Sequence, residues 1–167
     1  MLTDLAWYAL LTRTRYENTV CEGLIKKSFD IFLPTISVPS KRRDRKVTLH
    51  PPLFPNYLFV KTSLNPNRHT EMLKTVGAIR LIGGATGPIP VADEVINSLR
   101  IMVVNASHIA IGKRLKKGDP VCVVNGPFSG IRGFFSRYRG KNRVIVQIDA
   151  LGQFAAVEVN ESDIERL

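Results

Sequence analysis

The sequence contains few of the residues that build covalent or metal-bound scaffolds. Two cysteines and three histidines occur among 167 residues, and no two of them are close neighbours in the chain. Structural zinc sites usually show close-spaced Cys or His pairs. Cys21 falls in a predicted helix and Cys122 between valines in a predicted strand, as expected for packed, reduced thiols. We therefore expect no disulfide framework, no metal and no other cofactor.

Long apolar runs are also lacking. No stretch approaches the ~20 apolar residues that a membrane helix needs, and residues 1–7 lack the basic start and apolar core of a secretion signal. With 44% hydrophobic and 23% charged residues, the composition is that of a globular protein with one average domain or two small ones. We expect a cytoplasmic monomer that does not bind membranes.

Acidic residues are scarce relative to basic ones. There are 14 Asp and Glu against 24 Lys and Arg, which gives a formal charge of +10. Nucleic acid, a membrane surface and an acidic protein are the partners to consider. A membrane surface would favour a basic amphipathic helix, whereas the densest basic clusters, 41–46 and 137–143, fall in predicted turns between strands. Nucleic acid or its machinery is the favoured partner.

The first part of the chain alternates strand and helix signals. Residues 7–11 predict a buried strand, and the Thr14-to-Glu17 spacing predicts a helix with a capping box. The other elements expected here are strands at 31–33 and 36–38, a turn at 41–46, strands at 47–49 and 54–61, a short helix within 69–75, a strand at 79–82 and a helix at 92–105. This order predicts one sheet with helices packed on a face.

Helical periodicity disappears in the last part of the chain. A basic linker is expected at 106–117. Short strands are then predicted at 121–124, 132–138, 143–149 and 154–159. A domain this short has a marginal core, and closing the sheet into a small barrel would remove exposed edges.

Two motifs together resemble a known family. Residues 52–60 read Pro-Leu-Phe-Pro-Asn-Tyr-Leu-Phe-Val, and residues 118–121, Gly-Asp-Pro-Val, are followed at 126–130 by Gly-Pro-Phe-Ser-Gly. This combination resembles the NusG-family transcription elongation factors. The resemblance implies an α+β protein: an N-terminal α/β sandwich with a mainly antiparallel sheet (NGN domain, 1–105), the linker at 106–117, and a C-terminal SH3-like β-barrel (KOW domain, 118–167).

Within the family, the chain is most similar to RfaH-like specialised antitermination paralogues. Asn56 stands where general members usually carry Gly. His69 and Thr70 resemble the start of a His-Thr-Thr element that contacts the second side of the polymerase cleft, although Glu71 replaces its last Thr. The alternative for His69 is a polar residue at the surface of a helix start.

The resemblance implies a role in transcription elongation and antitermination. The NGN domain would bind the clamp helices of the largest RNA polymerase subunit and suppress pausing and termination on specific operons. Rigid aromatic side chains suit such a contact. The residues expected to bind polymerase are Tyr8, Phe54, Tyr57, Phe59, His69 and Thr70. The alternative for Phe59 is that it packs in the core of the sheet and does not contact polymerase. Phe54 and Tyr57 are expected to be more exposed.

Basic residues imply a second contact. In the family the NGN domain lies near the non-template DNA strand, which Arg13, Arg15 and the 41–46 turn with Arg42, Arg43 and Arg45 could reach. Such contacts would position the protein without reading sequence. The alternative for this cluster is a solvated turn.

The C-terminal domain suggests a further partner. Family KOW domains bind a ribosomal small-subunit protein, or the termination factor Rho, near an Ile-Phe-Gly-Arg segment that corresponds to residues 150–153 here, Ala-Leu-Gly-Gln. The absence of the aromatic residue and the Arg speaks against Rho, while Leu151 and Gly152 could still bind the ribosomal protein.

Two other function classes are alternatives to a transcription factor. A KOW-containing RNA-binding or ribosome-associated protein would use the basic residues Arg132, Arg137, Arg139, Lys141 and Arg143. An enzyme is disfavoured because the cysteines and histidines suggest no nucleophile-base pair, and Gly83-Gly84 lacks the rest of a phosphate-binding loop.

Overall fold

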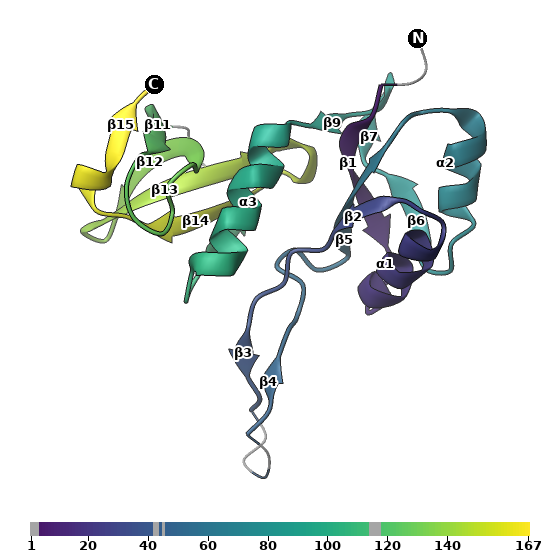
Figure 1. Ribbon diagram of the computed structural model, residues 1–167, viewed down its shortest axis with the longest axis horizontal. Helices are drawn as coiled ribbons and strands as arrows, with labels where there is room; N and C mark the ends of the chain where they lie inside the picture. Colours follow the sequence, from purple (N-terminus) through teal and green to yellow (C-terminus); the bar gives the residue numbers. More distant parts are fainter. Residues whose placement is uncertain (1–3, 42–43, 45, 114–117) are drawn as a thin grey trace. The chain divides into compact units, whose positions relative to one another are not determined.

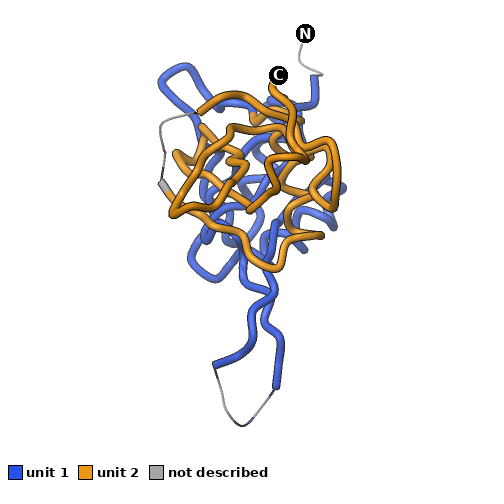
Figure 2. The backbone as a smooth tube through the Cα atoms, turned by 90° about the vertical axis from the view of Figure 1, so that its left-hand side faces the viewer, with its two compact units in different colours: residues 1–90 blue, residues 91–167 orange. Residues whose placement is uncertain are grey.

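The chain divides into two compact units, residues 1–90 and 91–167 (Figure 2). The computed structural model describes residues 4–41, 44, 46–113 and 118–167. By its contacts, the helix after residue 92 falls in the second of these units. The fold is α+β with mostly antiparallel sheets, as the sequence predicts.

Unit 1 is built on one antiparallel sheet with the strand order β2-β5-β1-β6 (Figure 1). Its elements are β1 (Ala6–Thr12), α1 (Glu17–Lys26), β2 (Asp30–Phe32), β3 (Val38–Pro39), β4 (Thr48–Leu49), β5 (Tyr57–Thr62), α2 (Pro66–Leu73), β6 (Ala78–Leu81), β7 (Gly83–Gly84) and β8 (Gly87–Pro88). The last two strands form a small separate hairpin.

The register of β1 and β5 separates two apolar faces. Tyr8 lies opposite Val60 and Leu10 opposite Leu58, and these side chains join the core that includes Val20 of α1. Because strand side chains alternate, the residues between them point to the other face. The helices α1 and α2 therefore cover one face of the sheet, and an aromatic row occupies the opposite face.

Both helices of unit 1 begin differently from the sequence prediction. The N-cap of α1 is Tyr16, without a side-chain cap hydrogen bond, so the expected capping box at Thr14 is wrong. Arg15 adopts a left-handed φ of 68°, which places Thr14 outside the helix start. Helix α2 begins at Pro66, earlier than predicted, because the Asn65 side chain accepts a hydrogen bond from the backbone N–H of Asn67 at 2.9 Å.

The segment between β2 and β5 forms an extended two-stranded arm. β3 pairs with β4, the backbone N–H of Ser40 donates to the carbonyl of Val47 at 2.8 Å, and an isolated bridge joins Thr35 to Pro52. Figure 1 shows this arm leading away from the sheet of unit 1. The hairpin predicted around residues 41–46 is confirmed, although residues 42, 43 and 45 lie outside the described part of the chain.

The described residues of unit 2 form one α-helix and an antiparallel sheet of six strands in the order β10-β14-β13-β12-β11-β15. Its elements are α3 (Asp93–Asn105), β10 (Ala110–Lys113), β11 (Pro120–Val123), β12 (Arg132–Tyr138), β13 (Lys141–Ile148), the 3-10 turn η1 (Asp149–Leu151), β14 (Gln153–Glu158), η2 (Glu161–Asp163) and β15 (Ile164–Arg166). The short strand β9 (Pro90–Val91) lies at the division between the units. Strand β10 falls inside the segment expected to be a linker, where it pairs with β14.

Helix α3 packs on β12 and β13 of its own unit. The buried Ser98 hydroxyl accepts a hydrogen bond from the Arg132 backbone N–H at 3.1 Å and lies 3.4 Å from the Arg132 carbonyl oxygen. The Arg132 guanidinium pairs with Glu94 at 3.3 Å. A side chain at Gly130 would also meet Ile101. These contacts hold α3 to the sheet of unit 2.

Candidate functional site

Aromatic side chains cluster on the face of the unit 1 sheet opposite α1 and α2. The Phe59 ring stacks on Phe32 with a centroid distance of 6.0 Å and meets Phe54 edge-on at 6.5 Å. Tyr57 begins β5 on the same face as Phe59 and lies opposite Leu11 of β1. Such contacts fix the rings in place, so the cluster is a rigid apolar support for this end of the sheet.

The aromatic residues expected to bind polymerase differ in burial. Phe54 and Phe59 are both fully buried, and Tyr8 is 6% exposed within the core beneath the helices. The prediction that Phe54 would be more exposed than Phe59 is therefore wrong, because both rings pack on each other. Tyr57 is partly exposed. Of these four residues, Tyr57 is therefore the one that is not buried.

Cationic residues lie at the same end of the sheet as Tyr57. Arg13 and Arg15 are exposed in the turn after β1, whose last residues run beside the start of β5. The Arg13 backbone is held by a hydrogen bond from its N–H to the Gly77 carbonyl at 2.8 Å. Strand β2 runs antiparallel to β5, so the arm after β2 also leaves the sheet at this end. The fold thus gathers an aromatic edge, two arginines and the arm.

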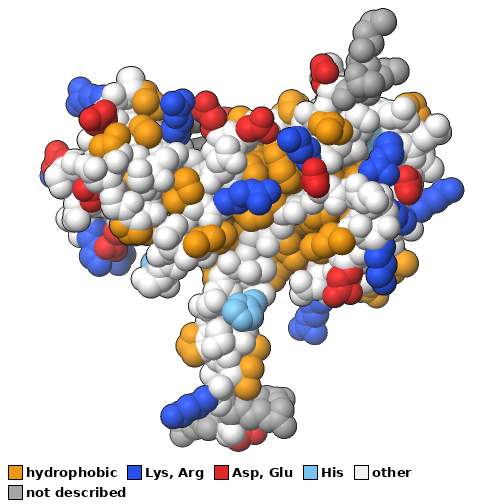
Figure 3. Space-filling model, in the orientation of Figure 1, with side chains coloured by type: hydrophobic (Ala, Val, Ile, Leu, Met, Phe, Trp, Pro, Cys, Tyr) orange, Lys and Arg blue, Asp and Glu red, His pale blue; other side chains and the backbone are white. Residues whose placement is uncertain are grey.

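The arm ends in basic residues. Lys41 and Lys46 are exposed near its end, and Figure 3 shows basic side-chain atoms in this region. Arg42, Arg43 and Arg45, the predicted DNA contacts, lie outside the described residues. Nearer the sheet, the Ser37 hydroxyl lies 3.2 Å from Nδ1 of His50, which links the two arm segments.

His69 and Thr70 lie on α2, on the opposite side of the sheet from Tyr57. His69 is partly exposed and Thr70 is exposed. Glu71, which departs from the His-Thr-Thr pattern, pairs with Arg68 at 3.0 Å, and its carbonyl accepts a hydrogen bond from Lys27 Nζ at 2.9 Å. Glu71 therefore stabilises the contact between α2 and the end of α1. The predicted polymerase-binding residues do not form one patch.

The predicted KOW contact lies between β13 and β14. Leu151 ends the 3-10 turn η1 and is partly exposed, and Gly152 follows with a left-handed φ of 60°. The Gly152 N–H donates to the Asp149 carbonyl at 3.1 Å. A tight turn therefore presents Leu151 at the surface of unit 2.

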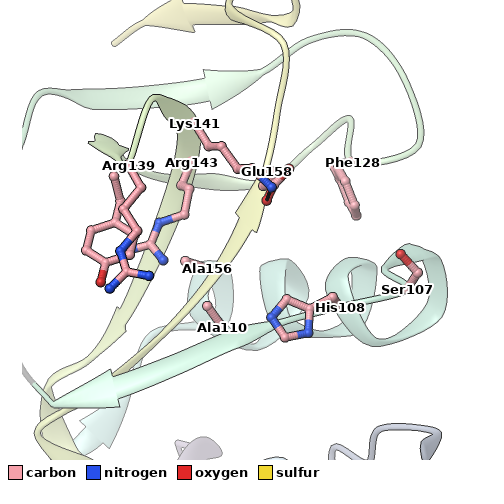
Figure 4. A pocket seen from close by; sticks show the side chains of 10 residues that line it. Ser107, His108, Ala110, Phe128, Arg139, Lys141, Arg143, Ala156 and Glu158 are labelled. Carbon is pink, nitrogen blue, oxygen red and sulfur yellow. Dashed lines mark ion pairs between the residues drawn. The ribbon is translucent and has the colours of Figure 1, made fainter.

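The structure separates the five basic residues of the alternative RNA-binding hypothesis. Arg132 pairs with Glu94, and Nε of Arg137 donates to the Asn142 side chain at 3.2 Å. The remaining three line a pocket of about 690 Å³ in unit 2 (Figure 4). Its lining residues are Ser107, His108, Ala110, Phe128, Tyr138, Arg139, Lys141, Arg143, Ala156 and Glu158. The sequence pointed to the cations but not to the pocket, whose lining comes from four separate segments.

Metal-ligating side chains are scattered in the described part of the chain. No group of three or more His, Cys, Asp or Glu residues there is placed to hold a metal ion. Burial, with a smaller effect from the charge of Glu22, raises the pKa of the Cys21 thiol, which disfavours the reactive thiolate. Among the described helices, none is long and apolar enough to cross a membrane.

Comparisons with known proteins agree on one family. Residues 5–100 match the family model described as transcription termination factor nusG. The transcription termination/antitermination protein NusG of Deinococcus radiodurans is 26% identical over 189 residues, covering 98% of this chain and 100% of that protein. The protein of the same name from Rickettsia conorii is 23% identical, covering 96% of this chain and 89% of that protein. The solved structure of Thermotoga maritima NusG shares the fold, with a TM-score of 0.57, 22% identity and 98% coverage of both chains. The chain therefore belongs to the NusG family of transcription termination/antitermination factors.

Proposed function

We propose that the chain binds the clamp helices of RNA polymerase through the Tyr57 end of the unit 1 sheet and suppresses pausing and termination. The observation that carries this proposal is the convergence of Tyr57, Arg13, Arg15 and the arm on one end of a sheet. An aromatic anchor beside cations suits a protein surface that lies next to nucleic acid. Family membership supports the transcriptional role.

In this proposal the aromatic residues have two roles, support and direct contact. Phe54 and Phe59 are buried and act as support: Phe59 lies in the same strand as Tyr57, and the Phe54 carbonyl accepts a hydrogen bond from the Tyr57 N–H at 3.1 Å. Tyr57 makes the direct contact. His69 and Thr70, on α2, make a separate contact with the second side of the polymerase cleft.

Two further contacts complete the proposed complex. Arg13, Arg15 and the 41–46 turn, whose sequence includes Arg42, Arg43 and Arg45, contact the phosphates of the non-template DNA strand. Leu151 and Gly152 of unit 2 bind the ribosomal small-subunit protein. The action is restricted to specific operons, in keeping with the resemblance of residues 52–60 to the specialised paralogues.

A binding experiment without nucleic acid tests the polymerase contact. Tyr57→Ser should weaken binding to immobilised cognate polymerase by about 30-fold, the loss of about 2 kcal/mol that marks an interface hot spot. Tyr138→Ser is the matched control, because Tyr138 is a partly exposed tyrosine of unit 2. Retention of full affinity by Tyr57→Ser, or failure of polymerase to bind the unaltered chain, would contradict the proposal.

Transcription in vitro tests the activity itself. On templates that carry pauses and terminators, the chain should shorten pauses and increase readthrough, and Tyr57→Ser should do neither. Templates from several operons should respond unequally. An equal response on every template would contradict the restriction to specific operons while leaving polymerase binding intact.

A further inference from the structure

The pocket of unit 2 has an apolar floor and a polar rim. Ala110 of β10 and Ala156 of β14 are register partners and form the floor, and their small side chains leave the space above them open. In Figure 4, Arg139 and Arg143 lie on one side of this floor, and Phe128, Ser107 and His108 lie on the other. A volume of about 690 Å³ lies within the range of about 300–1,000 Å³ typical of small-ligand sites.

The charge of the rim is strongly positive. Glu158 is the single acidic residue among those that line the pocket, and it pairs with Lys141 at 3.2 Å. No carboxylate of the described residues pairs with Arg139 or Arg143, and Nε of Arg143 is buried without a hydrogen-bond partner there. The positive charge of both guanidinium groups is therefore not neutralised by a carboxylate of the described residues, and the planar fork of a guanidinium is well suited to an anion.

An aromatic ring accompanies these cations. Tyr138 is 50% exposed, and the guanidinium carbons of Arg143 and Arg139 lie 4.8 Å and 5.2 Å from its ring centroid. Arg139 and Gly140 have left-handed φ angles of 51° and 76°, which form the tight turn that keeps Arg139 beside the ring. Cations that track phosphates beside an exposed aromatic ring are typical of sites for single-stranded nucleic acid.

We propose that this pocket binds one nucleotide of a single-stranded nucleic acid. Arg139 and Arg143 bind the phosphate, and the base stacks on the exposed part of Tyr138 above the alanine floor. A recessed site of this size takes an unpaired base, whereas a base in a duplex is already stacked and paired. The site is separate from the polymerase contact at Tyr57, so either can fail without the other.

Fluorescence anisotropy with the full chain tests the site. Labelled single-stranded RNA, single-stranded DNA of the same sequence, the corresponding DNA duplex and a polyglutamate peptide of equal charge are the four probes. At least one single strand should bind more tightly than the duplex and the peptide, and the tighter of the two identifies RNA or DNA as the ligand. Equal binding of all four probes, or no binding of either single strand at low salt, would overturn the proposal.

Variants distinguish the pocket from diffuse charge. Tyr138→Ala and Arg139→Ala should each lower single-strand affinity about tenfold, since stacking of one base is worth about 1–3 kcal/mol and tenfold corresponds to about 1.4 kcal/mol. Arg137→Ala removes the same charge two residues before Arg139, on β12 and outside the pocket, and should change affinity less than twofold. An equal loss with Arg137→Ala would overturn the proposal.

A space-filling variant tests the cavity without altering charge. Ala110→Leu, in a partly exposed position of β10, should lower single-strand affinity at least fivefold while leaving the salt dependence unchanged. Thermal unfolding of each variant checks that unit 2 stays folded. Full affinity in a folded Ala110→Leu chain would show that the base does not enter the pocket.

Discussion

The two units arrange their aromatic and cationic residues differently. In unit 1 the rings of Phe32, Phe54 and Phe59 pack on one another, and the cations lie at the end of the sheet. In unit 2 the cations line a pocket, and one exposed ring lies among them. The partly exposed Tyr57, supported by these packed rings and flanked by cations, suits a protein partner, whereas a cationic pocket with one exposed ring suits an unpaired nucleotide.

The local backbone explains this difference. In unit 1 the alternation of β5 places Leu58 and Val60 beneath the helices and leaves Tyr57 and Phe59 for the other face. In unit 2 the tight turn between β12 and β13 places Tyr138 opposite Lys141 in the register. The strand β5 thus lines up aromatic residues along a face of the sheet, whereas the turn between β12 and β13 brings Tyr138 and its cations into a compact cluster.

The largest expected effect is the loss of unit 2 in Gly133→Ala. A Cβ atom at Gly133 would collide with the backbone carbonyl oxygen of Ile145, which cannot move without breaking the sheet. We expect a cost of about 3 kcal/mol or more, at the upper end for overpacking. Amide NMR spectra should lose the signals of β12 and β13 and keep those of unit 1. Polymerase binding through Tyr57 should survive, while binding of single strands is lost.

Gly84→Ala is the control for this experiment. The nearest atom to a Cβ there is Cδ1 of Ile89 at 3.9 Å, an ordinary contact. It should leave both units folded. Loss of the unit 1 signals in Gly133→Ala would show that the two units do not fold independently, and the comparison between their sites would no longer rest on separate domains.

The elements that hydrophobic periodicity could predict are largely present. The apolar alternation of residues 54–61 identified β5, and the stripe through Val20 and Leu24 identified α1. The start of α1 was misjudged, because the left-handed Arg15 overrides the capping signal at Thr14. Local patterns predict elements well and their exact ends poorly.

Features that depend on distant pairing were missed. Strand β10 reads as part of a linker because its pattern is weak, and it becomes a strand only by pairing with β14. Likewise, the packing of α3 on the sheet of unit 2 involves contacts with Arg132, which lies 34 residues after Ser98 and 38 residues after Glu94. The pocket is lined by residues of β10, β12, β13 and β14 together with residues of the connecting loops, so the sequence could supply its cations but not their arrangement.

An intermediate effect is expected for charge reversal in the arm. Replacing Arg42, Arg43 and Arg45 with Glu should flatten the salt dependence of binding to a transcription complex by about 2 in the log–log slope, since each lost single-strand phosphate contact contributes about 0.7. Oligonucleotide binding in the unit 2 pocket should not change in slope. Titrations from low to physiological salt measure both quantities.

The matched control for the arm variant reverses the charge of three cations that lie outside the arm. Lys26, Lys74 and Arg166 are exposed cations outside the arm, and their reversal should leave the slope for the transcription complex nearly unchanged. If both triple variants lower the slope equally, the arm contributes only to the general positive charge. The DNA contact in unit 1 would then be diffuse.

The smallest expected effect concerns Asn56, at the start of the aromatic surface. Asn56 has a left-handed φ of 74°, and its carbonyl accepts a hydrogen bond from the Thr12 N–H at 2.8 Å. Asn and Gly tolerate this conformation, so Asn56→Gly should leave the free energy of unfolding nearly unchanged, whereas Asn56→Val should lower it by about 1–2 kcal/mol. Denaturant unfolding of unit 1 measures both.

The same variant tests the preference among operon templates. If Asn56→Gly keeps that preference, the choice between Asn and Gly reflects backbone conformation, and any specialisation must come from other residues such as Tyr57 and the arm. Loss of that preference with unchanged stability would instead make the Asn56 side chain part of the recognition surface.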